Sequence, residues 1–187
     1  MDKAQSTNNQ TTYFTFLLHL RRSMKYRTIL LFGSPGAGKG VTISVDGKVV
    51  GYDNIGQKFT EDNYFWGRPS AVDYNAAGSA GSNKGPSNPD YLQTVKDRID
   101  SFLAHNPEVK RNEIPSELVT ASGSGLDPDI SPAAAYIQIK RIAAARNLPV
   151  DKLKELVDQH TQQPLAGMLG PSTVNVLKLN ISLDNLK

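Results

Sequence analysis

A glycine-rich run near the N-terminus has the residue types that bind phosphate. The run reads GSPGAGKG and contains Gly33, Gly36, Gly38 and Lys39. In a phosphate loop, backbone N–H groups surround the phosphates while the lysine contacts the outer ones, and the loop opens a helix. Here the next residue, Val41, has no hydroxyl group, and a β-hairpin pattern stands where the helix should begin. The run is therefore an alternative nucleotide site, with Lys39 predicted not to be catalytic.

A second loop of small residues offers the same chemistry in another form. It spans Thr120–Pro128 with the sequence TASGSGLDP. Small residues let backbone N–H groups approach a phosphate and serine hydroxyls can donate to it, although a carboxylate in the loop would repel it. The same Asp and Ser side chains could instead cap turns and the following helix without any ligand. Both interpretations stay open for the candidate residues, which are Ser122, Gly123, Ser124, Gly125, Leu126 and Asp127.

A cluster of aromatic residues could dock a partner protein. Tyr64, Phe65 and Trp66 are followed by Gly67 and Arg68. Trp, Tyr and Arg are enriched at the residues that dominate binding energy in protein interfaces. Packing in the core is an equally good explanation of these side chains, and the sequence leaves both open.

Metal and catalytic constellations are not predicted. The histidines, His19, His105 and His160, show no paired ligand spacing, and the chain has no cysteine. Neighbouring carboxylates such as Asp127 and Asp129 fit caps and turns better than acid–base catalysis. We therefore assign no catalytic residue and no metal.

The charge and hydropathy of the chain argue against further classes of protein, namely nucleic-acid-binding, membrane-anchored and exported ones. The net charge of +3 is not concentrated in a basic run after Arg27, so no nucleic-acid partner is predicted. The apolar stretches Tyr13–Leu20 and Thr28–Phe32 are each shorter than the roughly 20 residues of a membrane-spanning helix, and basic residues separate them. We expect neither a membrane anchor nor a cleavable signal peptide.

Turn and cap signals divide the chain into elements. Asp46-Gly47 predicts a hairpin between two β-prone runs, and the chain from Gly51 to Pro89 lacks periodicity. Asn88-Pro89 and Ser131-Pro132 each precede a helix pattern. The predicted elements are strands at 28–32, 43–45 and 48–50, a helix from 89 to about 105, a short strand ending at 118–119, helices at 133–146 and 150–160, and a C-terminal strand at 177–183. The prediction is a single small α+β domain with about three helices, preceded by a flexible tail over residues 1–12.

The separated motifs of the chain resemble one known family over residues 41–187. They are Gly56-Gln57 with Phe59, YFWGRPSA from Tyr64, Tyr74-Asn75, GSNKGPSN from Gly81, LVTASGSGLDP from Leu118, ISPAAA from Ile130, Gln138 with Arg141, and VNVLKLNISL from Val174. This order is similar to that of the C subunit of the bacterial Kdp potassium-transporting P-type ATPase. Ala80, Lys84 and Lys140 depart from its pattern.

The resemblance implies an accessory, non-catalytic subunit in an ATP-driven potassium uptake complex. Its implied partners are the channel-like potassium-binding subunit and the ATP-hydrolysing P-type subunit, whose assembly and ATP binding it would assist. The implied cofactor is ATP, shared with the partner at Ser122 to Asp127. The implied location is the bacterial inner membrane, with the domain outside the cytoplasm; membrane association would come through the complex, since the family's N-terminal anchor is not predicted here.

Residues 25–41 resemble instead the opening of adenylate kinases, and residues 1–40 are therefore set apart from the domain at 41–187. Two alternatives follow. The chain could be a nucleotide-binding protein that uses Gly33 to Gly40, or a soluble chimera that folds like the C subunit without joining a complex.

Overall fold

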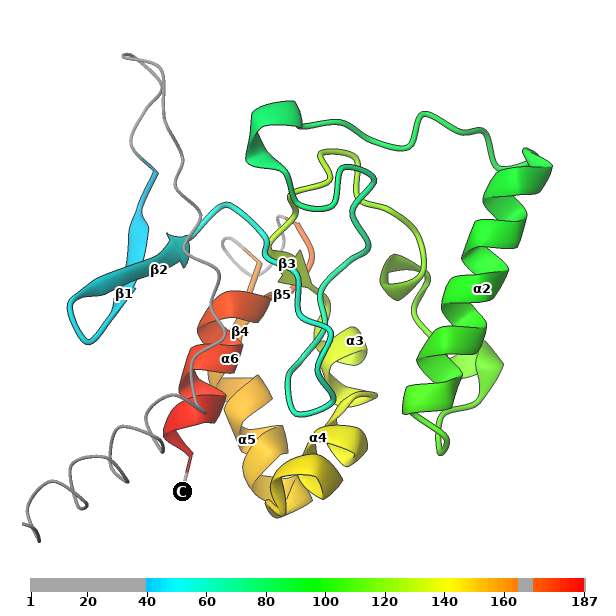
Figure 1. The fold of residues 1–187 in the computed structure, drawn as a ribbon. Coiled ribbons are helices and arrows are strands. Elements are labelled where there is room, and N and C mark those ends of the chain that lie inside the picture. Colours follow the sequence, from blue (N-terminus) through cyan, green and yellow to red (C-terminus); the bar gives the residue numbers. More distant parts are fainter. Residues whose placement is uncertain (1–39, 165–169, 187) are drawn as a thin grey trace, which may run out of the picture.

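The fold combines a hairpin, a group of packed helices and a long irregular segment (Figure 1). The computed structural model describes residues 40–164 and 170–186. The elements are β1 (Thr42–Val45), β2 (Lys48–Tyr52), η1 (Ala76–Gly78), α2 (Pro89–His105), η2 (Arg111–Glu113), η3 (Ser116–Leu118), β3 (Asp129–Ile130), α3 (Pro132–Tyr136), α4 (Ile139–Arg146), α5 (Val150–His160), β4 (Thr161–Gln162), β5 (Thr173–Asn175) and α6 (Val176–Asn185). The predicted α+β class is confirmed.

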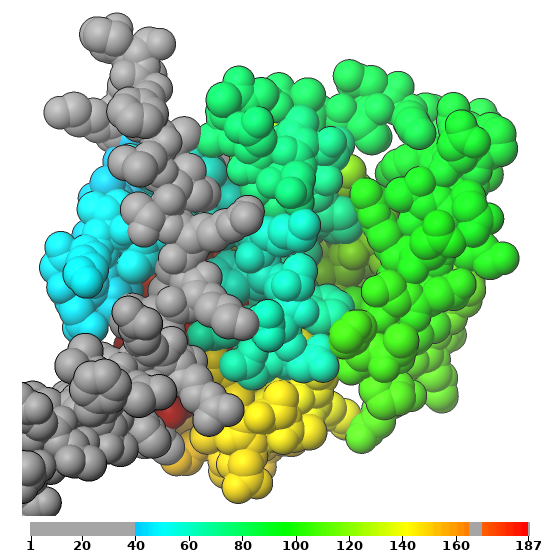
Figure 2. All heavy atoms as spheres, viewed as in Figure 1, coloured from blue at the N-terminus to red at the C-terminus, as the bar shows by residue number. Residues whose placement is uncertain are grey.

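The N-terminal hairpin follows from its turn residues. β1 and β2 pair antiparallel, and Asp46 and Gly47 between them have φ values of 49° and 74°. Positive φ at both central residues is what a type I′ turn requires. The predicted hairpin is confirmed, and Figure 1 and Figure 2 show it on the side of the molecule opposite α2.

Helix α2 begins and ends with asparagine caps. The Asn88 side chain accepts a hydrogen bond from the Tyr91 N–H at 3.0 Å, and Pro89 occupies the first turn. At the other end Asn106 is buried and its side chain donates to the Phe102 carbonyl at 2.9 Å. Only Phe102 of α2 is fully buried, so most of this helix lies against solvent.

The predicted helix 133–146 is confirmed in position but is divided into α3 and α4. Ser131 caps α3 by accepting from the Ala134 N–H at 3.2 Å. The division falls at Gln138, whose side chain donates to the Ala134 carbonyl four residues earlier and also to the Trp66 carbonyl. α4 then ends at Asn147 in the left-handed conformation, and α5 occupies the predicted range to His160.

The predicted C-terminal strand is wrong, because residues 177–183 lie in α6. The Asn175 side chain caps this helix by accepting from the Lys178 N–H at 3.0 Å. The alternation of Leu177, Leu179, Ile181 and Leu183 fits a strand, but Val176, Leu179, Asn180 and Leu183 form a buried helical stripe. Because Asn180 in this stripe is polar, the apolar residues alone do not show the helical period. The predicted strand end at 118–119 is also wrong, since residues 116–118 form a 3-10 helix that the Pro115 carbonyl begins.

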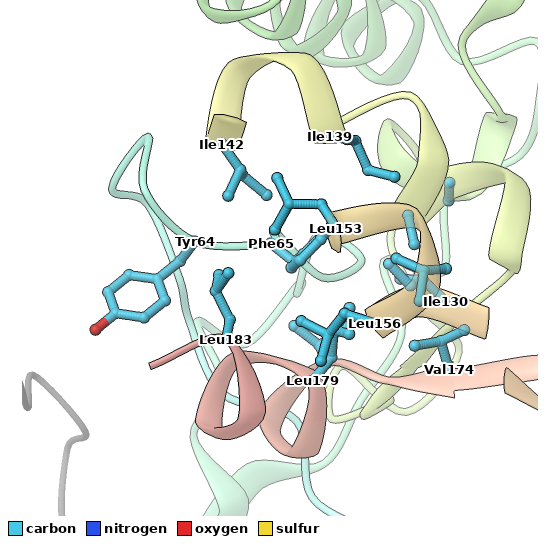
Figure 3. Packing of buried hydrophobic residues seen from close by; sticks show 14 of the residues in the cluster. Tyr64, Phe65, Ile130, Ile139, Ile142, Leu153, Leu156, Val174, Leu179 and Leu183 are labelled. Atoms are coloured by element: carbon cyan, nitrogen blue, oxygen red, sulfur yellow. The ribbon is translucent and has the colours of Figure 1, made fainter. Parts of the chain in front are cut away.

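The core lies where the last four helices meet a small sheet. α5 contacts α3, α4, α6 and β5, and β5 pairs antiparallel with both β3 and β4. Figure 3 shows Phe65 from the irregular segment inserted among side chains of these helices. The core therefore needs both the C-terminal half of the chain and the segment before α2.

Some predictions fall outside the described residues, namely the flexible tail, the strand at 28–32 and the glycine run at 33–39. Among the residues that the structure does describe, no helix is both long enough and apolar enough to cross a membrane.

Candidate functional site

Two buried side-chain amides hold the extended chain at Phe65 and Trp66. The Phe65 N–H donates to Asn180 Oδ1 at 2.9 Å, and Asn180 Nδ2 donates to the Phe65 carbonyl at 3.0 Å. Gln138 repeats this arrangement at Trp66, with distances of 2.8 and 3.1 Å. Buried backbone groups need hydrogen-bond partners, so these amides replace the neighbouring strand that the segment lacks.

Arg141 fixes the residues just before this point. Its Nη1 donates to the carbonyls of Asp62 at 2.6 Å and Tyr64 at 3.1 Å, and its guanidinium lies 4.2 Å from the centre of the Trp66 ring. Nε donates to Asn106 and Nη2 to Gln138. The side chain is 3% exposed, and burial lowers the pKa of Arg141 to about 10, against the opposing effect of Asp62. Arg141 therefore stays a cation at neutral pH.

A second arginine binds the segment to α6. Arg146 Nη2 pairs with Asp184 Oδ1 at 2.6 Å, and Arg146 Nε donates to the Asn63 carbonyl at 2.7 Å. The Tyr64 hydroxyl donates to the other Asp184 oxygen at 3.0 Å. Burial, followed by the charge of Asp184, raises the pKa of Tyr64 to about 12. We call residues 61–66, held by α4 and α6, the clamped segment.

The predicted docking residues lie in different environments. Tyr64 and Phe65 are buried, which favours the core interpretation for both. Trp66 is half-buried, with its ring edge-on to Phe102 and His105 and its Nε1 donating to the Glu61 carbonyl at 2.9 Å. Arg68 keeps about a quarter of its side chain exposed, at 25%.

The structure brings the two predicted loops together. Arg68 Nη1 pairs with Asp127 Oδ2 at 2.9 Å, and the Ser122 N–H donates to the Pro69 carbonyl at 3.1 Å. The Ser79 hydroxyl donates to the Ser124 carbonyl at 3.0 Å. Residues 68–81 and 122–127 thus form one surface, and residue 68 follows the clamped segment closely in the chain.

Two glycines permit the close approach of these loops. A Cβ atom on Gly56 would lie 2.4 Å from the Asp127 carbonyl oxygen, and one on Gly81 would lie 2.9 Å from the Gly123 carbonyl oxygen. Both distances are too short for a side chain. These small residues therefore have a packing role, whether or not a ligand binds.

The Ser122–Asp127 loop makes the contacts expected of a capped turn. Ser124 Oγ accepts from the Leu126 N–H at 3.1 Å, and Asp127 Oδ1 accepts from the Asp129 N–H at 3.1 Å. Ser122 is buried, whereas Gly123 and Ser124 are exposed at the tip. The nucleotide interpretation remains a prediction, while the Arg68 charge offsets that of Asp127.

The alternative phosphate loop at Gly33, Gly36, Gly38 and Lys39 lies outside the described residues.

Within the described ranges, no group of His, Asp and Glu side chains could hold a metal ion. His105 contacts Asp62 at 2.8 Å, and His160 contacts Ser182 Oγ at 2.8 Å.

Sequence reasoning noted Gln138 and Arg141 only as matched positions, and it missed Asn180, Arg146 and Asp184. A signal was available for Asn180 alone, because this polar residue lies four positions after Val176, on the buried stripe of α6. Arg146 and Asp184 carried no signal, because their contact joins residues 38 positions apart.

Comparison with known proteins gives a consistent result. A family model described as the c chain of the K+-transporting ATPase matches residues 11–185. A protein of Flavobacterium johnsoniae, named the potassium-transporting ATPase KdpC subunit, is 62% identical over 154 residues, covering 82% of each chain.

Proteins with the same name from other bacteria are less similar in sequence. The one from Bacteroides fragilis is 54% identical over 155 residues, covering 82% of this chain and 81% of its own. The one from Caldanaerobacter subterraneus is 53% identical over 154 residues, covering 82% of this chain and 79% of its own. The motifs that form the clamped segment and its adjoining loops lie within the residues that the family model matches, and this chain belongs to the KdpC family, the C subunits of K+-transporting ATPases.

Proposed function

We propose that this chain acts by binding the other subunits of an ATP-driven potassium uptake complex, and that it supplies no reacting group of its own. Its partners would be the channel-like potassium-binding subunit and the P-type ATPase subunit. Membrane association would come through this complex. The observation that carries the proposal is an exposed loop surface, residues 78–80 and 123–124, which we call the loop platform.

Order in the loop platform supports a binding role. Loops as long as the one between β2 and α2 usually serve binding when they are ordered. The two loops that form the platform are joined to each other by the Arg68–Asp127 ion pair and the Ser79–Ser124 hydrogen bond. Because these contacts already fix the loops, a partner would not have to order them, and less of the binding free energy is lost.

Co-purification of the complex tests this proposal. Ala80 is exposed on the platform, and Ala104 is exposed on α2. We expect the wild-type chain and Ala104→Arg to recover the other subunits when co-expressed with them, and Ala80→Arg to recover at least tenfold less, a loss of about 1.4 kcal/mol. Equal recovery with both variants would argue against the platform as the contact surface.

A second function, support of ATP binding by the P-type subunit, is favoured by the exposed tip of the platform. Gly123 and Ser124 are exposed there, and Arg68 offsets the charge of Asp127 that would otherwise repel phosphate. A Cβ on Gly123 meets no atom within 4 Å, so the position accepts a side chain.

The matched variants Gly123→Ala and Gly123→Glu separate charge from shape. We expect Gly123→Glu to raise the KM for ATP of the assembled complex, because its carboxylate would repel the phosphates, and Gly123→Ala to behave as wild type. The same KM for both variants would refute the ATP role while leaving subunit binding unaffected.

A further inference from the structure

Helix α2 is attached to the rest of the domain through its C-terminal half. Arg98 Nη1 donates to the Val119 carbonyl at 3.1 Å, and Phe102 is buried in the core cluster. Asn106, which ends the helix, is buried and accepts a hydrogen bond from Arg141 Nε at 3.1 Å. These contacts join this half of the helix both to the segment before β3 and to α4.

The N-terminal half of α2, residues 89–97, makes no hydrogen bond or ion pair to another element within the described part of the chain. Its side-chain hydrogen bonds stay inside the helix: Gln93 donates to Asp97 at 2.7 Å, and Thr94 donates to the Asp90 carbonyl at 2.8 Å. Phe102 is the buried residue of α2, so this half has no fully buried side chain. Regions with few buried apolar contacts open locally at a lower free energy than the core does.

The apolar face of α2 is covered at one end of the helix and exposed at the other. Its residues recur at helical spacing and are Leu92, Val95, Ile99 and Phe102. Phe102 is 4% exposed, Val95 and Ile99 are half-buried, and Leu92 is 53% exposed. The face that packs in the C-terminal half is therefore progressively uncovered toward the start of the helix.

A short stretch of chain joins the start of α2 to the loop platform, and Figure 1 shows it leading from η1 into the helix. The platform includes residues 78–80. The next residue, Gly81, is held so closely that its Cβ would lie 2.9 Å from the Gly123 carbonyl oxygen. Residues 82–88 can then span at most about 25 Å, which is less than the roughly 30 Å width of a small domain. A subunit bound at the platform can therefore also reach Leu92.

We propose that α2 is a hinged arm, in which residues 98–106 stay fixed, residues 89–97 open and close separately from the core, and a subunit bound at the loop platform holds them closed by an apolar contact with Leu92. An apolar side chain is the matching occupant, because Leu92 offers hydrocarbon and no hydrogen-bonding group. The closure rests on the proposed function, that the chain binds other subunits, whereas the opening is a property of the free chain.

Amide hydrogen exchange tests the arm in the free chain and in the complex. Residues 94–97 and 102–105 both lie beyond the first four N–H groups of the helix, so their amides have partners inside it. We expect the amides of residues 94–97 to exchange at least tenfold faster than those of 102–105 in the free chain. In the assembled complex residues 94–97 should slow at least tenfold, while 102–105 change little. Equal protection of the two ranges in the free chain, or unchanged exchange of 94–97 in the complex, would overturn the proposal.

Leu92→Gln tests the apolar contact, and Gln93→Ala is the control at the neighbouring exposed position. Both variants should unfold at the temperature of the wild type, since neither side chain is buried and each new residue favours helix. We expect Leu92→Gln to lower recovery of the other subunits about fivefold, the effect of losing roughly half the burial of a leucine, and Gln93→Ala to match the wild type.

Recovery of Leu92→Gln at the level of Gln93→Ala would overturn the contact at Leu92. Failure of the wild-type chain to recover any subunit would overturn the proposed function and the closure with it. The two failures are distinguishable, because the faster exchange of residues 94–97 is measured in the free chain and depends on no partner.

Discussion

Replacing Asn180 with leucine should show how much the clamped segment depends on one buried amide. Asn180 is fully buried and makes two hydrogen bonds with Phe65, at 2.9 and 3.0 Å. Leucine has a similar volume but no polar atom. The substitution leaves the Phe65 N–H and carbonyl buried without these partners.

The expected cost follows from those two groups. Each buried backbone group left unsatisfied costs about 1 to 3 kcal/mol, and the better burial of leucine offsets part of the sum. We therefore expect Asn180→Leu to lower the free energy of unfolding by about 3 kcal/mol, which corresponds to a fall in Tm of roughly 6 to 12 °C for a chain of this length.

Denaturant unfolding monitored by Trp66 fluorescence measures this change, and amide hydrogen exchange at Phe65 and Trp66 should accelerate in the variant. Asn185→Leu makes the same substitution at an exposed position of α6 and should change stability by less than about 0.5 kcal/mol. A loss below about 1 kcal/mol in Asn180→Leu, with unchanged exchange at Phe65, would refute the role assigned to the clamp.

Three further predictions concern other parts of the chain. Gly56→Ala should destabilise the fold by about 1 to 3 kcal/mol in urea unfolding, because its Cβ would lie 2.4 Å from the Asp127 carbonyl oxygen; a neutral effect would contradict this close packing. Tyr64 and Tyr74, whose pKa values burial raises to about 12, should ionise last in a spectrophotometric titration. Since unfolded tyrosines ionise near pH 10, the stability that these two contribute is complete below about pH 10 and is lost as the pH rises toward 12, and their late ionisation should vanish in concentrated urea. Deleting residues 1–40 should leave a cooperative thermal transition, because the described residues after them already contain a hydrophobic core cluster from Tyr64 to Leu183; loss of cooperativity would place part of the deleted segment in the domain.

Local signals in the sequence determined the hairpin and the helix ends. Asp46-Gly47 tolerates the positive φ values that the turn needs, and Ser131 supplies the cap of α3. These features involve residues within four positions of each other, so their chemistry can be read without knowing the fold. The order of separated motifs likewise identified the family, which the comparisons confirm.

The tertiary structure alone decided the state of residues 177–183 and the environment of the aromatic cluster. The apolar pattern of residues 177–183 fits both a strand and a helix. The helix forms because Asn180 hydrogen-bonds Phe65, a residue 115 positions earlier in the chain. The same contact buries Phe65, which the sequence offered equally as a docking residue. The hydrogen bonds of Arg141 and the ion pair between Arg68 and Asp127 also join distant segments. No local propensity encodes such pairs, because their free energy arises only once burial removes the competing water.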